Sequence, residues 1–249
     1  MDLGLTDRVA VVLAASKGLG RATAEALAAE GADVAIGSRD GRSLETAAAE
    51  IRARSGRRVL ACSVDVTDAD QARAFVDAVV REFGRIDILV NNAGGPPFGK
   101  FDDFDDAAWG RAFELSLLST VRMTRLALPH IARDGGGRVI NIISMSVKSV
   151  LPGSILSTAL RSGVVGMAKM LADELGPDGI TVNNVAPGLI MTDRLRETGV
   201  GDRAAQSSLQ RAGRPEEFGA VVAFLASARA AYVTGTTIPV DGGLIRAIG

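Results

Sequence analysis

The most restrictive feature of this chain is a short apolar run that leads into a glycine-rich turn and then an alanine-rich segment. The apolar run is Val9–Leu13, and the turn after it contains Gly18 and Gly20. Small or apolar residues then recur at helical spacing. Backbone N–H groups at such a turn, together with the positive end of the next helix dipole, stabilise a bound diphosphate. The segment therefore predicts a strand, a nucleotide-binding turn and a helix.

The same alternation of strand and helix continues along the chain, which is typical of a parallel sheet covered on both faces. A chain of 249 residues, 47% of them hydrophobic, can bury the core of such a fold. No repeat or linker divides it, so we expect a single α/β domain over residues 1–249, doubly wound and of Rossmann type. Seven parallel strands are predicted near residues 8–14, 32–38, 57–63, 86–91, 136–143, 179–186 and 236–240.

Charge and cysteine content exclude several classes of partner. The formal net charge is −1, which gives no electrostatic argument for nucleic acid or an anionic membrane. The single cysteine, Cys62, cannot form an intrachain disulfide and is interpreted as a small buried hydrophobe. The N-terminus has no leader pattern, and no later segment is expected to span a membrane. No cluster has metal-ligand spacing. The chain is predicted to be cytoplasmic, without a metal.

Further motifs lie in order along most of the chain. They are Asp65–Val66 after the third strand, Asn91–Gly94 after the fourth, Asn183–Gly188 at the sixth, and Val240–Gly243 near the C-terminus. In this order and spacing the chain resembles the short-chain dehydrogenase/reductase family, in particular its ketoacyl reductases. The resemblance implies an oxidoreductase acting on a small molecule, as a homotetramer or homodimer built on helices near 107–133 and 154–175.

The resemblance also implies which residues contact the cofactor. The second strand ends at Ser38, where enzymes that prefer NAD usually carry an acidic residue. Serine leaves room for a phosphate, and Arg39 and Lys17 could bind it, so NADP(H) is favoured over NAD(H). The alternative is that both cations are solvated and that Asp40 binds the ribose of NAD. The expected cofactor residues are Ser16, Lys17, Gly18, Leu19, Gly20, Ser38, Arg39, Asp65, Val66, Asn92, Ala93, Gly94, Arg161, Pro187, Gly188, Ile190 and Thr192.

The active site departs from the family pattern of serine, tyrosine, lysine and asparagine. Ser144 stands at the serine position, but Ser157 replaces the tyrosine and Arg161 replaces the lysine four residues later. Ser116 replaces the asparagine. A serine hydroxyl is a far weaker acid than a phenol, and arginine stays protonated, so neither is suited to donate a proton. Ala14, at the family's first glycine, is harmless only if its φ stays negative.

The remaining titratable side chains that could donate the proton include Lys148, Tyr232 and His130. If the chain after Ser144 continues extended, Lys148 points to the same side and could be a usable acid; otherwise it is a solvated loop residue. Tyr232, the only tyrosine, is interpreted as a packed structural ring near the last strand. His130, the only histidine, is assigned to the surface or to packing. The proton donor therefore stays open between Lys148, water and the substrate.

Three functions follow from these residues. The first is an NADP(H)-dependent oxidoreductase acting on a carbonyl or alcohol; the second is a non-redox enzyme on this scaffold, catalysing dehydration, isomerisation or cyclisation; the third is a catalytically silent nucleotide-binding subunit. Irregular stretches around Gly95 and over 192–214 should border the site, the second resembling the family's mobile substrate loop. Phe98, Phe101 and Leu195 indicate either a partly apolar substrate pocket or the packing of a lid over the site.

Overall fold

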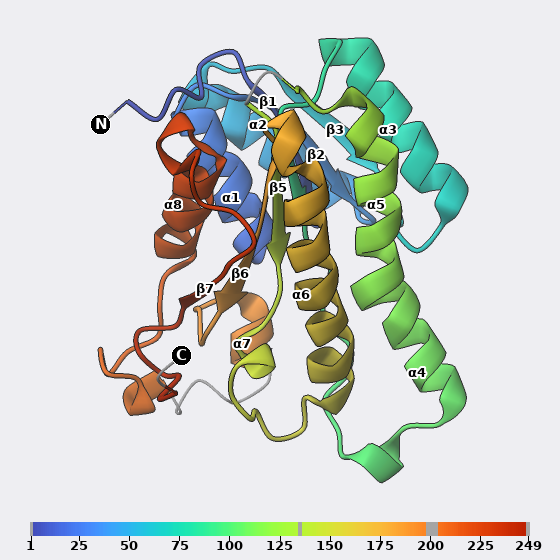
Figure 1. Ribbon diagram of the computed structural model, residues 1–249, viewed down its shortest axis with the longest axis vertical. Helices are drawn as coiled ribbons and strands as arrows, with labels where there is room; N and C mark the ends of the chain where they lie inside the picture. Colours follow the sequence, from blue (N-terminus) through green and yellow to red (C-terminus); the bar gives the residue numbers. More distant parts are fainter. Residues whose placement is uncertain (1, 134–135, 198–203, 248–249) are drawn as a thin grey trace.

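Seven parallel strands form one twisted sheet in the computed structural model, which describes residues 2–133, 136–197 and 204–247. The strand order is β3-β2-β1-β4-β5-β6-β7. Figure 1 shows the sheet inside the molecule, between the helices. This order reverses between β1 and β4, and in such sheets ligands bind at that point, beyond the carboxyl ends of the strands. The strands are β1 (Val9–Leu13), β2 (Asp33–Ser38), β3 (Val59–Ser63), β4 (Ile88–Asn91), β5 (Arg138–Ile142), β6 (Thr181–Pro187) and β7 (Thr237–Val240).

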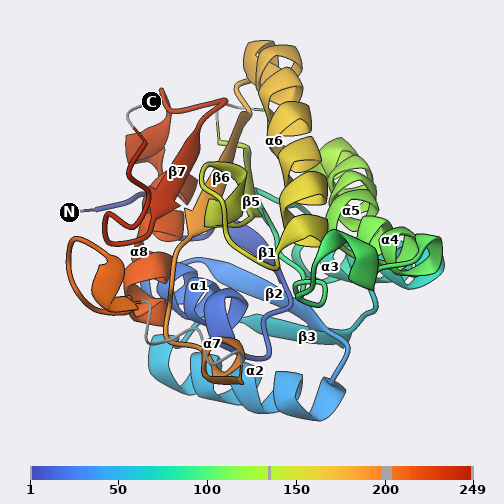
Figure 2. The same cartoon turned by 90° about the horizontal axis from the view of Figure 1, so that it is seen from below.

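Helices cover both faces of the sheet, as Figure 2 shows from below. One core lies between the sheet and α1, α2 and α8, and the other lies between the sheet and α3, α5 and α6. The doubly wound α/β prediction is therefore confirmed. The helices are α1 (Gly18–Ala29), α2 (Gly41–Ser55), α3 (Ala69–Phe83), α4 (Asp106–Phe113), α5 (Ser119–Ala127), α6 (Ile155–Leu175), α7 (Asp193–Glu197) and α8 (Pro215–Ala226).

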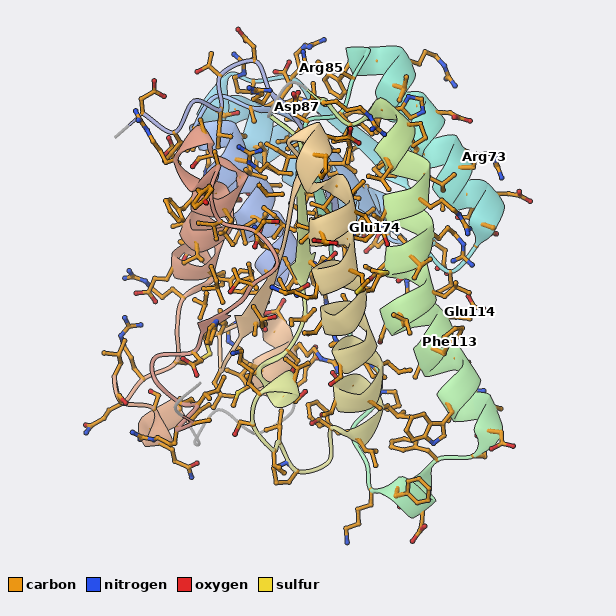
Figure 3. The ribbon with its side chains drawn as sticks, in the orientation of Figure 1. Arg73, Arg85, Asp87, Phe113, Glu114 and Glu174 are labelled. Carbon is orange, nitrogen blue, oxygen red and sulfur yellow. The ribbon has the colours of Figure 1, made fainter. Side chains whose placement is uncertain are left out.

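Ion pairs tie β1 and β4 together at the end of the molecule that lies away from α7. The Asp87 side chain is fully buried, and its carboxylate accepts a hydrogen bond from the N–H of Val9 at 2.9 Å. Arg8 and Arg85 donate to the same carboxylate at 2.9 and 2.6 Å, and Figure 3 shows Arg85 beside Asp87. The amino ends of β1 and β4, where the strand order reverses, are therefore held together by these contacts. The opening between the two strands lies at their carboxyl ends.

A chain of buried amides crosses the sheet near those carboxyl ends. Asn91, Asn141 and Asn184 stand in register on β4, β5 and β6. The Asn91 amide donates to Asn141 at 2.9 Å, and Asn141 donates to Asn184 at 2.9 Å. Asn184 continues the chain to the Thr237 hydroxyl on β7 at 3.2 Å. Paired polar groups inside a sheet fix the register of its strands, because a slip would leave each amide without a partner.

Several expectations about individual segments were wrong. Helix α6 with the turn after it, Ile155–Asp178, does reach the length of a membrane span, and its most apolar 18 residues have a mean hydropathy of 1.2; a core helix that packs on a sheet can share both properties. Stretch 192–214 is not irregular throughout, because it contains α7; its residues 198–203 lie outside the described residues. Tyr232 is not packed but fully exposed. Cys62 on β3 is only half-buried, although it does pack against the core.

Candidate active site

A cleft of about 420 Å³ opens at the carboxyl ends of β1, β2, β4, β5 and β6. This volume lies in the range of small-molecule and cofactor sites. Its walls come from the turn before α1, the loop after β4, the start of α6, and the segment from the end of β6 into α7. The predicted cofactor residues that line it are Ser16, Lys17, Gly18, Leu19, Ser38, Arg39, Asp65, Val66, Asn92, Ala93, Gly94, Arg161, Pro187, Gly188, Ile190 and Thr192.

The turn before α1 has the conformation that a diphosphate site needs. Gly18 has a φ of +60°, and a side chain there would approach the methyl group of Thr192. Gly20 does not line the cleft; a Cβ on it would lie 2.4 Å from the carbonyl oxygen of Ala14. Ala14 has a φ of +49°, so its methyl group does cost strain, about 1 kcal/mol. The turn nevertheless brings backbone N–H groups to the start of α1, as a diphosphate requires.

The end of β2 suits a phosphate better than a free ribose hydroxyl. The Ser38 hydroxyl lies 3.0 Å from that of Ser16, and Arg39 and Lys17 line the same part of the cleft. Asp40 is engaged elsewhere, because its carboxylate caps α2 by accepting hydrogen bonds from the N–H groups of Arg42 and Ser43. It does not line the cleft. These contacts weaken the alternative in which Asp40 binds the ribose of NAD.

The residues at the serine and tyrosine positions both face the cleft. Ser144 follows β5, and its hydroxyl accepts a hydrogen bond from the N–H of Ser146 at 3.2 Å. Ser157 lies in the first turn of α6 and also lines the cleft. No hydrogen bond between described residues uses the Ser157 hydroxyl, so it is free to meet a ligand. The two serines can orient a carbonyl oxygen between them.

The condition under which Lys148 would share the cleft is not met, and its exposure fits the alternative of a solvated loop residue. The chain does not continue extended after Ser144; it forms a 3₁₀ turn over Met145–Val147. This turn buries the Ser146 hydroxyl without a partner and leaves Lys148 outside the residues that line the cleft. The strict alternation on which the prediction depended is a property of extended backbone, and a turn removes it.

Arg161 is a buried cation at the base of the cleft. Only 7% of the residue is exposed, and its Nη1 donates to the carbonyl oxygens of Ile142 and Ile143 at 3.0 and 2.7 Å. These bonds clamp the guanidinium against the end of β5, next to Ser144. Burial, with a smaller contribution from the charge of Arg194, lowers the pKa of Arg161 to about 10. The side chain therefore stays charged at neutral pH and does not act as a proton donor there.

Ser116 lies in a small polar cavity behind the cleft, and not in the cleft itself. It sits in a π-helical turn, Glu114–Leu118, that joins α4 to α5; Figure 3 labels Glu114, at the start of this turn. The cavity measures about 10 Å³, close to the space of one water molecule. Three buried atoms of its lining residues have no partner among the described residues: Ser116 Oγ, Asn91 Oδ1 and Arg161 Nε. The cavity therefore has room for one water molecule among residues that carry unpartnered donors and acceptors.

The sequence reasoning missed part of the cleft. Phe98 and Leu195 line it as expected, but Phe101 does not. His130 is exposed, as assigned. Among the described residues, no group of three or more histidine, cysteine, aspartate or glutamate side chains could hold a metal ion. Lining residues that the sequence did not single out include Leu115, Met145, Leu151, Ser154 and Arg194, which come from separate loops and helix ends with no local pattern to identify them.

Comparison with known proteins gives matches over almost the whole chain. A family model described as enoyl-(acyl carrier protein) reductase matches residues 13–245. The chain is 35% identical over 244 residues to the 3-oxoacyl-[acyl-carrier-protein] reductase FabG of Thermotoga maritima, covering 97% of this chain and 99% of that protein.

Two solved structures are similar to this chain in fold and carry NADPH. The L-sorbose reductase of Gluconobacter frateurii, complexed with NADPH and L-sorbose, has a TM-score of 0.94 and 32% identity, with all of both chains covered. An NADPH-bound short-chain oxidoreductase of Pseudomonas aeruginosa, which contains an atypical catalytic centre, has a TM-score of 0.93 and 35% identity, with coverage of 98% of this chain and 99% of that one.

Proposed function

Since the chain belongs to the short-chain dehydrogenase/reductase family, we propose that it is an NADP(H)-dependent oxidoreductase that interconverts a carbonyl and an alcohol on a small molecule. The observation that carries the proposal is the single cleft in which Arg39 and Lys17 lie at one end and Ser144 and Ser157 at the other. NADPH-bound relatives at 32% and 35% identity support the choice of cofactor.

The cofactor would be held by the residues already described. The turn at Gly18 would hold the diphosphate, Ser38 and Arg39 the 2′-phosphate, and the segment from Pro187 to Thr192 the nicotinamide. When bound, NADPH supplies a hydride to the carbonyl carbon and leaves as NADP⁺, and the carbonyl oxygen takes up a proton. The residues that face the cleft fit this group, because Ser38 is not acidic and Asp40 is turned away.

The chain's own residues would position the substrate and stabilise charge. Ser144 and Ser157 would donate hydrogen bonds to the carbonyl oxygen, and the nearby charge of Arg161 would stabilise the negative charge that develops on it. Because neither serine is an adequate acid, we propose that the proton comes from water or from the substrate itself. Without a side-chain acid, the protein should reduce simple, unactivated ketones slowly.

Turnover and binding with both cofactors test this function. We expect oxidation of NADPH with at least one activated carbonyl compound, and tighter binding of NADPH than of NADH in a fluorescence titration. Binding of NADPH without oxidation by any carbonyl in a broad panel would instead support the non-redox enzyme. Failure to bind either cofactor would reject both the oxidoreductase and the silent nucleotide-binding subunit.

Replacing Arg39 by aspartate should reverse the cofactor preference. A charge-assisted hydrogen bond contributes about 1.5–3 kcal/mol, so loss of the phosphate contact predicts a roughly 10- to 150-fold weaker Kd for NADPH. NADH should bind more tightly, because the new carboxylate can accept hydrogen bonds from the ribose. Arg42→Asp is the matched control, since Arg42 is exposed on α2 and does not line the cleft. Equal affinities for NADPH and NADH in the unmodified protein would reject the preference.

Replacing Lys148 by alanine should change turnover less than about twofold, because surface side chains away from a site rarely matter to it. Ser157→Ala should lower turnover more, since Ser157 faces the cleft. Steady-state rates from pH 6 to 10 measure both. If Lys148→Ala instead removes a basic limb from the pH profile and costs more than Ser157→Ala, Lys148 supplies the proton after all.

We also propose that the whole chain acts as one catalytic domain in the cytoplasm, as a homotetramer or homodimer. Exposed apolar side chains support an interface on the long helices: Met170 on α6 is 60% exposed and Phe113, labelled in Figure 3 on α4, is 41% exposed. A second copy, and not lipid, would then cover the outer face of α6, whose inner face packs on β6 and carries Arg161 into the site.

A further inference from the structure

Arg194 on α7 reaches across the mouth of the cleft to the loop that follows β4. Its Nη2 donates to the carbonyl oxygen of Pro96 at 2.9 Å, and its guanidinium lies 5.8 Å from the centre of the Phe98 ring. A Cβ placed on Gly95 would come within 2.7 Å of that Nη2, so glycine is what allows the close approach. The guanidinium is thus held at a defined place in the wall of the cleft.

This place is the catalytic end of the cleft and not the diphosphate turn. The ring of Phe98 lies against Gly153, and the N–H of Gly99 donates to the carbonyl oxygen of Gly153 at 2.8 Å. Gly153 lies two residues before the start of α6, whose first turn carries Ser157. The loop that Arg194 contacts therefore packs beside the start of α6, the helix that carries Ser157. The residue that approaches the turn at Gly18 is instead Thr192.

Two arginines at the catalytic end of the cleft have no carboxylate partner among the described residues. Neither Arg194 nor Arg161 forms an ion pair with a carboxylate within residues 2–133, 136–197 and 204–247. The acidic neighbour of Arg194, Asp193, pairs instead with Arg196 at 2.8 Å. The like charge of Arg194 also contributes to the lowered pKa of Arg161. An anionic group placed between the two arginines would relieve this repulsion.

Besides these cations, three serines and Asp193, the residues that line this end of the cleft are mostly apolar, so the substrate that fits has an apolar body and one charged end. We propose that Arg194 binds a carboxylate of the substrate, and that the substrate is therefore an oxo acid or the corresponding hydroxy acid. Guanidinium binds carboxylate with two parallel hydrogen bonds, which orients as well as attracts the ligand. The apolar walls around this end are Phe98, Leu115, Met145, Leu151 and Leu195.

The inference rests on the proposed function, and paired substrates test it. An oxo acid and its methyl ester differ in the carboxylate charge while keeping the same carbonyl. For the unmodified protein we expect kcat/KM to favour the acid by at least about tenfold. Arg194→Leu should abolish that preference through the KM of the acid, leave the ester within about twofold, and leave the Kd of NADPH unchanged. The preference should also shrink as salt is raised, because Arg194 is exposed.

Arg73→Leu is the matched control, since it removes the same charge at an exposed residue of α3 that does not line the cleft. It should keep the preference for the acid. A preference for the ester, equal losses for acid and ester in Arg194→Leu, or a weakened Kd for NADPH would overturn the proposal; the last two results would assign Arg194 to the fold or to the cofactor.

A binding measurement separates this inference from the oxidoreductase function. Calorimetry of a hydroxy acid and its methyl ester, titrated into the protein with NADP⁺, needs no turnover. Binding of the acid that Arg194→Leu weakens at least tenfold would support the carboxylate site even if no carbonyl is reduced. Acid and ester that bind alike, or an acid that binds Arg194→Leu as well as the unmodified protein, would reject it.

Discussion

Replacing Arg161 by methionine should weaken NADPH binding by roughly 10- to 150-fold, the range of one charge-assisted hydrogen bond. The side chain is clamped by two carbonyl oxygens at the end of β5, so its orientation toward the cleft is set before any ligand binds. No hydrogen bond between described residues uses its Nη2, which leaves that nitrogen for the nicotinamide ribose. Methionine keeps the unbranched stem of the side chain and removes the charge. Titration of NADPH fluorescence measures the change.

Arg161→Lys separates charge from hydrogen-bond geometry. Lysine keeps the charge but cannot bond both carbonyl oxygens and the ribose with a rigid planar group, so its affinity should be intermediate. The pH dependence should differ too. Because the pKa of Arg161 is about 10, affinity in the unmodified protein should hold below that pH and fall above it, whereas a buried lysine should lose its charge at lower pH. Unchanged affinity with collapsed turnover would assign Arg161 to the substrate instead.

Replacing Arg161 should also change the free energy of unfolding, through one destabilising and one stabilising effect. Two carbonyl oxygens would lose their donor, at about 1–3 kcal/mol each, while the desolvation cost of a buried cation would disappear. Thermal unfolding of both variants is therefore measured beside the titrations, so that a folding defect is not mistaken for lost binding.

The architecture was predictable from the sequence because the signals are local and repeated. Each of the seven strands lies within two residues of its expected bounds, since most are short, largely apolar runs next to a turn. The glycine turn was also placed correctly, although the structure gives Ala14 the positive φ that makes alanine unfavourable there. These predictions needed only the period of the pattern and the conformational demands of single residues.

The site was harder to predict because it depends on contacts between distant segments. Lys148 was expected in the cleft on the assumption of extended backbone, and a single 3₁₀ turn removes it. Arg194 gave no local signal; its importance appears only once α7 lies against residues 95–98, almost a hundred positions earlier. The length and hydropathy of α6 are likewise properties of one segment. They do not show whether its apolar residues face lipid or pack on the sheet, as those of α6 do against β6.

Restoring the absent pair as Ser157→Tyr with Arg161→Lys should raise the reduction of simple ketones at least tenfold. A phenol beside a lysine titrates much nearer neutrality than a serine hydroxyl, and general acid catalysis typically contributes about 10²- to 10⁴-fold. Position 157 faces the cleft opposite Ser144, and position 161 lies one helical turn further on the same face of α6. Either change alone should gain less, since the phenol needs the lysine and the lysine has no acid to tune.

Ser157→Phe with Arg161→Lys is the matched control, because it adds the same ring without the hydroxyl. It should show no gain, and Ser144→Ala in the restored background should remove most of the gain by taking away the second hydrogen bond to the carbonyl oxygen. Rates are measured with saturating NADPH, so that changes in cofactor affinity do not enter. A restored protein that binds NADPH but stays inert toward a broad ketone panel would count against the oxidoreductase, because the absent proton donor and its lysine would then have been supplied. The cleft would in that case serve dehydration, isomerisation or cyclisation, which need positioned serines and a buried cation but no hydride.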